Sequence, residues 1–225
     1  MTAQRHNGPS PLSGYRVFYS QFRKHFHHTG AVAPSSARLA RAITAPLART
    51  GRRPVRVLEV GAGTGVFTRA ILENLAAGDA LDVYEINPAF EPYLRSVLAG
   101  GEARGVRCRL HLDDITRAMS AEPFHYIISG LPLNNFPAPE VEAILALYMS
   151  LLVPGGTLSY FEYLYIRNLK RALVQNPGER ARLNAVGDVV TAFLERYPNH
   201  SAAVRLNLPP AVARHVVAPA PGADH

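Results

Sequence analysis

Apolar and polar positions alternate along the chain in a way that predicts strands and helices in turn. Short apolar runs predict strands, and each is followed by a stretch whose apolar positions recur at helical spacing. The predicted strands cover residues 55–60, 81–86, 106–112, 124–129 and 156–162, and the predicted helices cover 65–77, 89–99, 138–152 and 165–174. This alternation is typical of an α/β domain with a mostly parallel sheet. A helix over 179–197 and extended stretches over 201–208 and 212–217 follow the break at Pro177-Gly178.

Two more helices are predicted before the alternating region. Tyr15, Phe18, Tyr19, Phe22 and Phe26 recur on one face of a helix, with basic residues mainly off that face. This helix either packs on the core or lies in a membrane interface, with its aromatic side in the lipid boundary; the pattern leaves both open, and the absence of acidic residues favours the membrane. The second is the alanine-rich stretch 37–48, after a loop of small residues at 29–36 that either covers a ligand or simply joins the two helices. The chain thus divides into a disordered start (1–13), a basic helical segment (14–53) and one domain (54–218).

Charge is distributed unevenly along this organisation. The net charge is +7, yet residues 1–53 hold nine Arg or Lys and no Asp or Glu. A one-sided basic segment indicates a polyanionic partner, either nucleic acid or an anionic membrane surface. No apolar run is long enough to cross a bilayer and no signal peptide is visible, and the single Cys108, expected to be a buried structural thiol, excludes an internal disulfide. We therefore expect a cytoplasmic protein that associates peripherally with the inner face of the cell membrane.

The clearest candidate for chemistry is the stretch that follows the first predicted strand. Gly61, Gly63 and Gly65 stand at a strand-to-helix turn, where glycines permit positive φ and close approach of a ligand. Glu59 stands two positions before the first glycine, and a second strand ends in Glu85, at a spacing that suits a carboxylate on ribose hydroxyls. The pattern indicates a nucleotide-type cofactor, because both dinucleotides and S-adenosylmethionine are bound by such a layout.

The spacing of the glycines distinguishes between the binding motifs of these two cofactors. The dinucleotide motif reads G-x-G-x-x-G, whereas position 66 is Val66. The stretch 59–65, Glu-Val-Gly-Ala-Gly-Thr-Gly, resembles the first motif of class I S-adenosylmethionine-dependent methyltransferases. The resemblance implies a Rossmann-like α/β fold: a seven-stranded sheet with helices on both faces, here with an extra N-terminal amphipathic helix. It also implies S-adenosyl-L-methionine as the cofactor and no metal. The cofactor-binding residues that we expect are Glu59, Gly61, Ala62, Gly63, Thr64, Gly65, Glu85, Ile86, Asp114, Ile115, Ser129 and Gly130.

The segment after the fourth predicted strand bears on the methyl acceptor. It reads Ser129-Gly130-Leu131-Pro132-Leu133 and lacks the Asn/Asp-Pro-Pro-aromatic motif common in methyltransferases of adenine and cytosine amines. With the stretches 30–36, 151–156 and 204–211, it resembles the bacterial phospholipid N-methyltransferases. That resemblance implies stepwise methylation of phosphatidylethanolamine to phosphatidylcholine on an anionic membrane. Asn134-Asn135 departs from the apolar residues expected there, so another aminolipid such as ornithine lipid stays open.

The acceptor site is predicted less sharply than the cofactor site. A primary amine must lose a proton before it attacks the methyl group, and no clear general base stands out in the sequence. Candidates that accept this proton or orient the amine are Ser129, Gly130, Leu131, Tyr19 and Tyr163, and the two tyrosines also suit a cationic head group. Plain packing is the simpler interpretation of either tyrosine. The lipid phosphate needs a cation, for which the candidates are Arg16, Arg23, Lys24, Arg167, Lys170 and Arg171.

Two rival functions remain. An RNA or DNA methyltransferase, similar to the rRNA adenine dimethyltransferases, would use the basic N-terminal segment on phosphates. A peripheral membrane protein with a vestigial cofactor site is the non-enzymatic alternative. The missing base-stacking motif argues against the first, and the acids at 59, 85 and 114 argue against the second. We therefore expect a lipid partner, no nucleic acid and no metal, and the sequence does not indicate an oligomeric state.

Overall fold

A computed structural model describes residues 37–48, 51, 54–117, 122–163, 177–207 and 209–220 of the chain. Several predictions fall outside these residues. They are the aromatic helix with Tyr19, the loop at 29–36, the helix over 165–174, and all six candidate phosphate-binding residues, Arg16, Arg23, Lys24, Arg167, Lys170 and Arg171. The described part contains the whole predicted sheet and the glycine turn.

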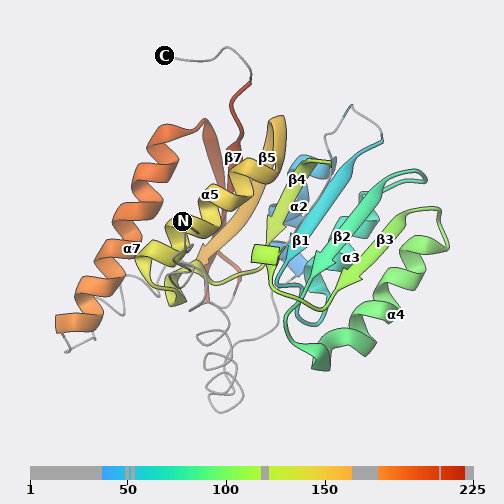
Figure 1. The fold of residues 1–225 in the computed structure, drawn as a ribbon, viewed down its shortest axis with the longest axis horizontal. Coiled ribbons are helices and arrows are strands. Elements are labelled where there is room, and N and C mark those ends of the chain that lie inside the picture. The colour runs from blue at the N-terminus through green and yellow to red at the C-terminus, as the bar shows by residue number, and fades with distance from the viewer. Residues whose placement is uncertain are drawn as a thin grey trace, which may run out of the picture.

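Seven strands form one mixed sheet, as the class I methyltransferase resemblance implies (Figure 1). Their order is β3-β2-β1-β4-β5-β7-β6. The first five strands along the chain run parallel, β7 pairs antiparallel with β5, and β6 pairs antiparallel with β7. The strands are β1 (Arg56–Val60), β2 (Ala80–Tyr84), β3 (Arg107–His111), β4 (Phe124–Ser129), β5 (Leu152–Tyr163), β6 (Asn199–Val204) and β7 (Ala211–Val217). The chain order reverses between β1 and β4, which is where α/β sheets bind ligands.

Helices cover both faces of the sheet and bury the two halves of the core. On one face, α2 (Ala37–Ala48), α3 (Val66–Glu73) and α4 (Glu91–Glu102) pack their apolar sides on the sheet. On the other, α5 (Ala138–Leu151) and α7 (Pro177–Arg196) do the same over β4, β5 and β7 (Figure 1). None of the described helices is long and apolar enough to cross a bilayer. The buried leucines, isoleucines and valines of both layers hold the strand ends in place.

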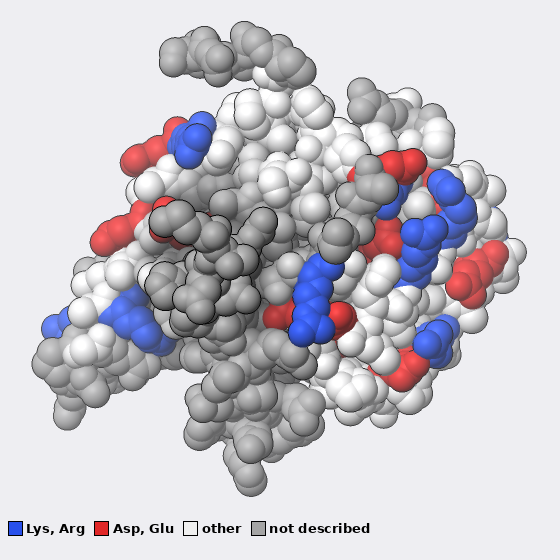
Figure 2. Space-filling view, viewed as in Figure 1, with Lys and Arg blue, Asp and Glu red and all other residues white. Residues whose placement is uncertain are grey.

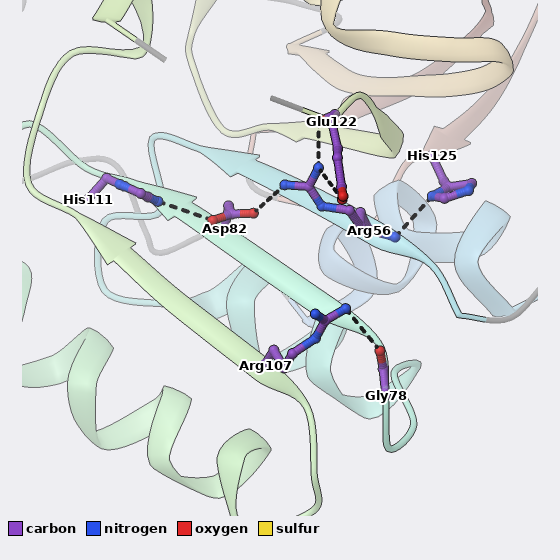
Figure 3. Close-up of polar contacts among 7 residues, drawn as sticks. All are labelled: Arg56, Gly78, Asp82, Arg107, His111, Glu122 and His125. Carbon is purple, nitrogen blue, oxygen red and sulfur yellow. Dashed lines mark hydrogen bonds and ion pairs between the residues drawn. The ribbon is translucent and has the colours of Figure 1, made fainter. Parts of the chain in front are cut away.

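The part of the second face formed by β2, β3 and the start of β1 is polar instead. Only the 3₁₀ turn η2 (Ile115–Arg117) is described between β3 and β4, and the side chains that a helix would otherwise bury are charged. Figure 2 shows Arg side chains interleaved with Asp and Glu on this side of the molecule. In Figure 3 the Arg56 guanidinium lies between Asp82 at 3.3 Å and Glu122 at 3.3 Å, and His111 contacts Asp82 at 3.1 Å. These contacts compensate the charges of the face.

Most predicted elements are confirmed, and the differences have local causes. Helix α2 and strand β4 have their predicted bounds, whereas the helix predicted over 65–77 ends at Glu73. The Asp79 carboxylate accepts from the backbone N–H of Ala76 at 2.8 Å and of Val55 at 2.9 Å, which turns the chain into β2 instead of another helical turn. The strand predicted over 156–162 begins earlier, at Leu152, because the first residues of β5 already pair with the start of β4.

Candidate functional site

The glycine turn between β1 and α3 is held in a conformation that favours glycine. Gly61, Gly63 and Gly65 have φ angles of 73°, 55° and 81°. The N–H of Gly61 donates to the carbonyl of Tyr84 at 2.8 Å, which ties the turn to β2. A Cβ on Gly61 would lie 2.6 Å from the Leu131 side chain, whereas a Cβ on Gly63 would meet no atom within 4 Å. Gly63 therefore marks the open side of the turn, where a ligand can approach the backbone.

Glu85 directly follows β2 and faces this turn. One carboxylate oxygen accepts from the N–H of Gly63 at 2.8 Å, and the other accepts from the N–H of Asn87 at 2.8 Å. The side chain is buried, at 1% exposure. Because a carboxylate can accept about four hydrogen bonds, Glu85 can also accept from the hydroxyls of a ribose. Glu85 and the glycine turn, both predicted to bind the cofactor, are in direct contact.

Glu59 is buried beneath the turn, where its ionised form would have no compensating charge. It is fully buried on β1, and within the described residues neither carboxylate oxygen has a hydrogen-bond partner. Burial raises the pKa of Glu59 to about 8, partly opposed by Thr68 and reinforced by the nearby charge of Glu85. Two carboxylates therefore share one small region. A cationic ligand stabilises such an arrangement, because it compensates charge that water cannot reach.

The strand-3 candidates, Asp114 and Ile115, open the 3₁₀ turn η2. The Asp114 carboxylate is 2% exposed and accepts from the N–H of Thr116 at 2.9 Å, so it caps the turn. Ile115 is 1% exposed and belongs to the core under α5. Ile86, which follows Glu85, is partly buried and packs against the same core. The structure places these residues on the β2 and β3 side of the site. It also shows Asp114 capping the 3₁₀ turn, which is the structural alternative to a role in cofactor binding.

The end of β4 lies directly against the glycine turn. Gly130 donates its N–H to the carbonyl of Val60 at 2.8 Å, and a Cβ on Gly130 would lie 2.5 Å from the carbonyl oxygen of Gly61. The Ser129 hydroxyl is buried and lies 3.1 Å from the Tyr148 hydroxyl on α5. Leu131 is 1% exposed. Gly130 thus brings the segment that we expect to border the acceptor into contact with the turn, while Ser129 is engaged in a buried pair.

Two further side chains lie on elements next to the β4 segment. Tyr163 ends β5 at the same edge, where its ring packs against Phe161 with centroids 5.1 Å apart and burial raises its pKa. Glu140 lies in the first turn of α5, shortly after the β4 segment, and was not among the residues expected from the sequence. It is 9% exposed, its Oε2 atom has no hydrogen-bond partner in the described residues, and burial raises its pKa. An acid in a first helical turn is ordinary, so no sequence signal distinguished it.

Together these residues are suited to bind a cationic nucleoside. The turn offers backbone at Gly63, Glu85 offers acceptors for hydroxyls, and Glu59 offers a buried carboxyl group whose ionised form a bound cation would stabilise. S-adenosylmethionine carries a ribose, a sulfonium and an ammonium, and so matches each feature. When bound, it supplies a methyl group that is already activated on sulfur. Among the described residues, no three His, Cys, Asp or Glu side chains gather as metal ligands.

Comparison with known proteins agrees with this interpretation. Residues 57–156 match the sequence profile of a family described as a methyltransferase domain. The ornithine lipid N-methyltransferase of Singulisphaera acidiphila is 27% identical over 156 residues, which cover 66% of this chain and 77% of that protein.

Solved structures share the fold. The magnesium protoporphyrin IX methyltransferase of Synechocystis, solved with bound SAH, superposes with a TM-score of 0.62 at 13% identity, over 92% of this chain and 99% of that chain. A further similar structure, described as a putative O-methyltransferase from Klebsiella pneumoniae, gives a TM-score of 0.61 at 17% identity, over 96% and 92% of the two chains. The predicted Rossmann-like fold is confirmed, residues 57–156 match a methyltransferase domain, and S-adenosylmethionine is supported as the cofactor.

Proposed function

We propose that this methyltransferase transfers methyl groups to the amine of a membrane aminolipid, with phosphatidylethanolamine and ornithine lipid as the two head groups to test. The observation that carries the proposal is the 27% identity with an ornithine lipid N-methyltransferase over two thirds of the chain. The sequence resemblance to phospholipid N-methyltransferases, which make phosphatidylcholine from phosphatidylethanolamine, supports the same class of acceptor. Both head groups present an amine beside a lipid anchor.

The β4 segment supports a lipid amine over a nucleic-acid base. Enzymes that methylate exocyclic base amines stack the base on an aromatic side chain. Within residues 129–136 the one aromatic residue is Phe136, and it is 1% exposed, packed in the core under α5. No aromatic face of this segment is therefore free to stack a base.

The proposed chemistry asks little of the chain beyond positioning and removal of a proton. The amine nitrogen, the methyl carbon and the sulfur must lie in line, and the Gly61–Gly130 contact keeps the two loops that border them at a fixed separation. An amine with a pKa of about 10 is protonated at neutral pH, so a proton must leave before the first transfer. We assign its acceptance to Glu140, because it lies in the first turn of the helix that follows the β4 segment, its Oε2 atom is buried without a hydrogen-bond partner in the described residues, and burial raises its pKa.

We also propose that the protein works at the cytoplasmic face of the cell membrane, as a peripheral protein. The acidic and basic residues of 54–225 nearly balance, so attraction to anionic lipid comes from the nine basic residues of 1–53. The membrane contact delivers a substrate that is insoluble in water.

The test is a methyl-transfer assay with labelled S-adenosylmethionine. Vesicles of phosphatidylethanolamine with phosphatidylglycerol, vesicles of ornithine lipid with phosphatidylglycerol, and total RNA serve as parallel acceptors. Label in either aminolipid supports the proposal, identifies the head group and counts the methyl groups. Label in RNA alone contradicts it and assigns the basic N-terminal segment to nucleic acid.

A further inference from the structure

The turn between β6 and β7 lies on the same edge of the sheet as the cofactor site. Strand β5 runs parallel to β4 and ends at Tyr163, which pairs with Ala211 at the start of β7. Val204, at the end of β6, also pairs with Ala211. The β6–β7 turn, residues 205–210, is therefore at the carboxyl edge, where β1, β2 and β4 also end.

The hydrogen bonds of this turn keep the side chain of Leu206 exposed to solvent. Leu206 is 72% exposed, while the next residue, Asn207, is 2% exposed. The N–H of Asn207 donates to the carbonyl of Val204 at 3.2 Å, and its side-chain amide donates to the carbonyl of Pro209 at 2.6 Å. A buried Asn that satisfies both ends of the turn keeps Leu206 projecting outward. The exposure of this large aliphatic side chain is therefore fixed by the hydrogen bonding of the turn.

A basic side chain accompanies Leu206. Arg205 is exposed and makes no ion pair or hydrogen bond with any described residue. Two other exposed arginines are compensated, Arg95 by Glu91 at 2.7 Å and Arg117 by Asp113 at 3.4 Å. No described residue therefore compensates the charge of Arg205, and its side chain is placed to contact a partner outside the described chain.

The other exposed apolar side chains lie at the same edge. In the described residues, the large hydrophobic side chains with high exposure are Leu206, Tyr93 at 59% and Leu112 at 38%. Tyr93 lies in the first turn of α4, soon after the end of β2, and Leu112 directly follows β3. A protein partner needs a contiguous patch of about 800 Å², whereas separate apolar points around one edge suit a deformable lipid surface.

We propose that the β6–β7 turn docks on the surface of an anionic phospholipid bilayer, with Leu206 in the acyl boundary and Arg205 on lipid phosphate. This inference rests on the proposed function, since a lipid acceptor has to enter the site from a bilayer. It adds a second membrane contact, distant in sequence from the basic N-terminal segment. The contact turns the carboxyl edge, and with it the cofactor site, toward the lipid.

The experiment measures partition of the full-length protein onto phosphatidylglycerol-containing vesicles, without cofactor or turnover. Leu206→Ser should lower the partition coefficient about tenfold at both low and high ionic strength. Arg205→Ser should lower it about fivefold at low ionic strength only. Leu206→Met keeps an apolar side chain and should bind as the unmodified protein does.

Arg107→Ser is the matched control for charge. Arg107 is exposed at the start of β3, on the opposite edge, and its guanidinium donates a 3.5 Å hydrogen bond to the Gly78 carbonyl (Figure 3). It should bind vesicles more strongly than Arg205→Ser. Unchanged partition of both turn variants, or equal losses in Arg107→Ser and Arg205→Ser, would overturn the proposal. So would a dimer in light scattering that Leu206→Ser dissociates, because the turn would then contact a second copy.

The experiments distinguish failure of the proposed function from failure of the proposed docking surface. If no aminolipid accepts label while Leu206→Ser still loses vesicle binding, the docking surface stands and the acceptor assignment falls. If aminolipid is methylated in detergent micelles and both turn variants bind vesicles normally, the acceptor assignment stands and the docking surface falls. Unchanged S-adenosylmethionine affinity in every variant shows that the fold is intact.

Discussion

Glu85 joins two tasks in one side chain, since its carboxylate orders the glycine turn through Gly63 and faces the expected ribose. Glu85→Ala should weaken S-adenosylmethionine binding by about 1–3 kcal/mol, because hydrogen bonds to a charged acceptor are lost. Isothermal titration measures this change. Glu73→Ala, which removes an exposed carboxylate at the end of α3, is the control and should leave affinity unchanged. An equal affinity in both variants would contradict the ribose assignment.

Glu59 makes the stability of the ligand-free protein depend on pH. Its pKa is about 8 in the fold against 4.5 ordinarily, so the folded state binds the proton more tightly than the unfolded state. Its contribution is therefore complete below about pH 4.5 and is lost as pH rises through 8. Glu59→Gln should remove this loss, so that at pH 8.5 the variant exceeds the unmodified protein by on the order of 3 kcal/mol in free energy of unfolding.

Urea titrations at pH 5 and pH 8.5 check the prediction for Glu59. The same variant should bind S-adenosylmethionine more weakly, since a neutral amide cannot compensate the cation. A higher free energy of unfolding at pH 8.5 together with a lower affinity for S-adenosylmethionine is the result expected for this variant. Parallel pH profiles of stability in the two proteins would show that Glu59 ionises freely in the fold.

Glu140 is the residue whose role depends most on the proposed chemistry. Glu140→Gln should lower kcat by about 10²-fold or more for the first methyl transfer, because the protonated amine then lacks an acceptor. Glu142→Gln, two residues along the same helix and exposed, is the matched control. The pH profile of kcat should shift only in the Glu140 variant. A loss that is equal at all pH values would assign Glu140 to positioning.

At the scale of elements, the contact between the end of β4 and the glycine turn sets the width of the site. A Cβ at Gly130 would lie 2.5 Å from the backbone oxygen of Gly61, and backbone at both loops is tied to neighbouring strands. Gly130→Ala should therefore destabilise the protein by about 1–3 kcal/mol and weaken cofactor binding. Thermal unfolding and cofactor titration measure the two effects.

Gly100→Ala is the control for the Gly130 variant. Gly100 lies inside α4, and an added Cβ meets no atom within 4 Å. It should stabilise the protein by about 0.5–1 kcal/mol, because alanine loses less backbone freedom in a helix. Destabilisation of similar size in both variants would mean that the cost at Gly130 does not come from the contact with Gly61.

The elements themselves could largely be predicted from the sequence, because apolar periodicity reports burial directly. The strand over 124–129 and the helix over 37–48 have their predicted bounds, since both are delimited by polar or glycine-rich neighbours. The end of α3 could not be predicted, because it depends on Asp79 bonding to Val55, 24 residues away. Strand order likewise depends on pairing between distant segments.

In the site, too, the features set by local sequence could be predicted and those set by distant contacts could not. The spacing of Glu59, Glu85 and the glycines predicted the cofactor, because that spacing places one strand beside another. The missing partners of Glu59 and the burial of Glu140 depend on packing against elements far along the chain. The assignment of Ser129 as a proton acceptor could not anticipate its pairing with Tyr148, 19 residues on.

At the scale of the whole molecule, charge separates the N-terminal quarter from the domain. Residues 54–225 carry 15 basic and 17 acidic residues, so the domain alone has no net attraction to an anionic bilayer. Deletion of residues 1–28, which precede the first described helix, should abolish sedimentation with anionic vesicles at moderate ionic strength. The unfolding transition and cofactor affinity should persist, because the sheet and the glycine turn lie within the described domain.

Vesicle sedimentation and cofactor titration of the truncated chain separate the two membrane contacts. Stable membrane attachment usually takes two weak signals, and here they would be the basic N-terminal segment and the β6–β7 turn. If both act, the truncated chain should bind again on vesicles with a higher fraction of anionic lipid, and Leu206→Ser should remove that residual binding. Persistent binding of the truncated chain with Leu206→Ser would place the membrane contact elsewhere on the domain. The attraction would then have to arise from local patches on the domain or from the five arginines of residues 29–53, which the truncated chain keeps.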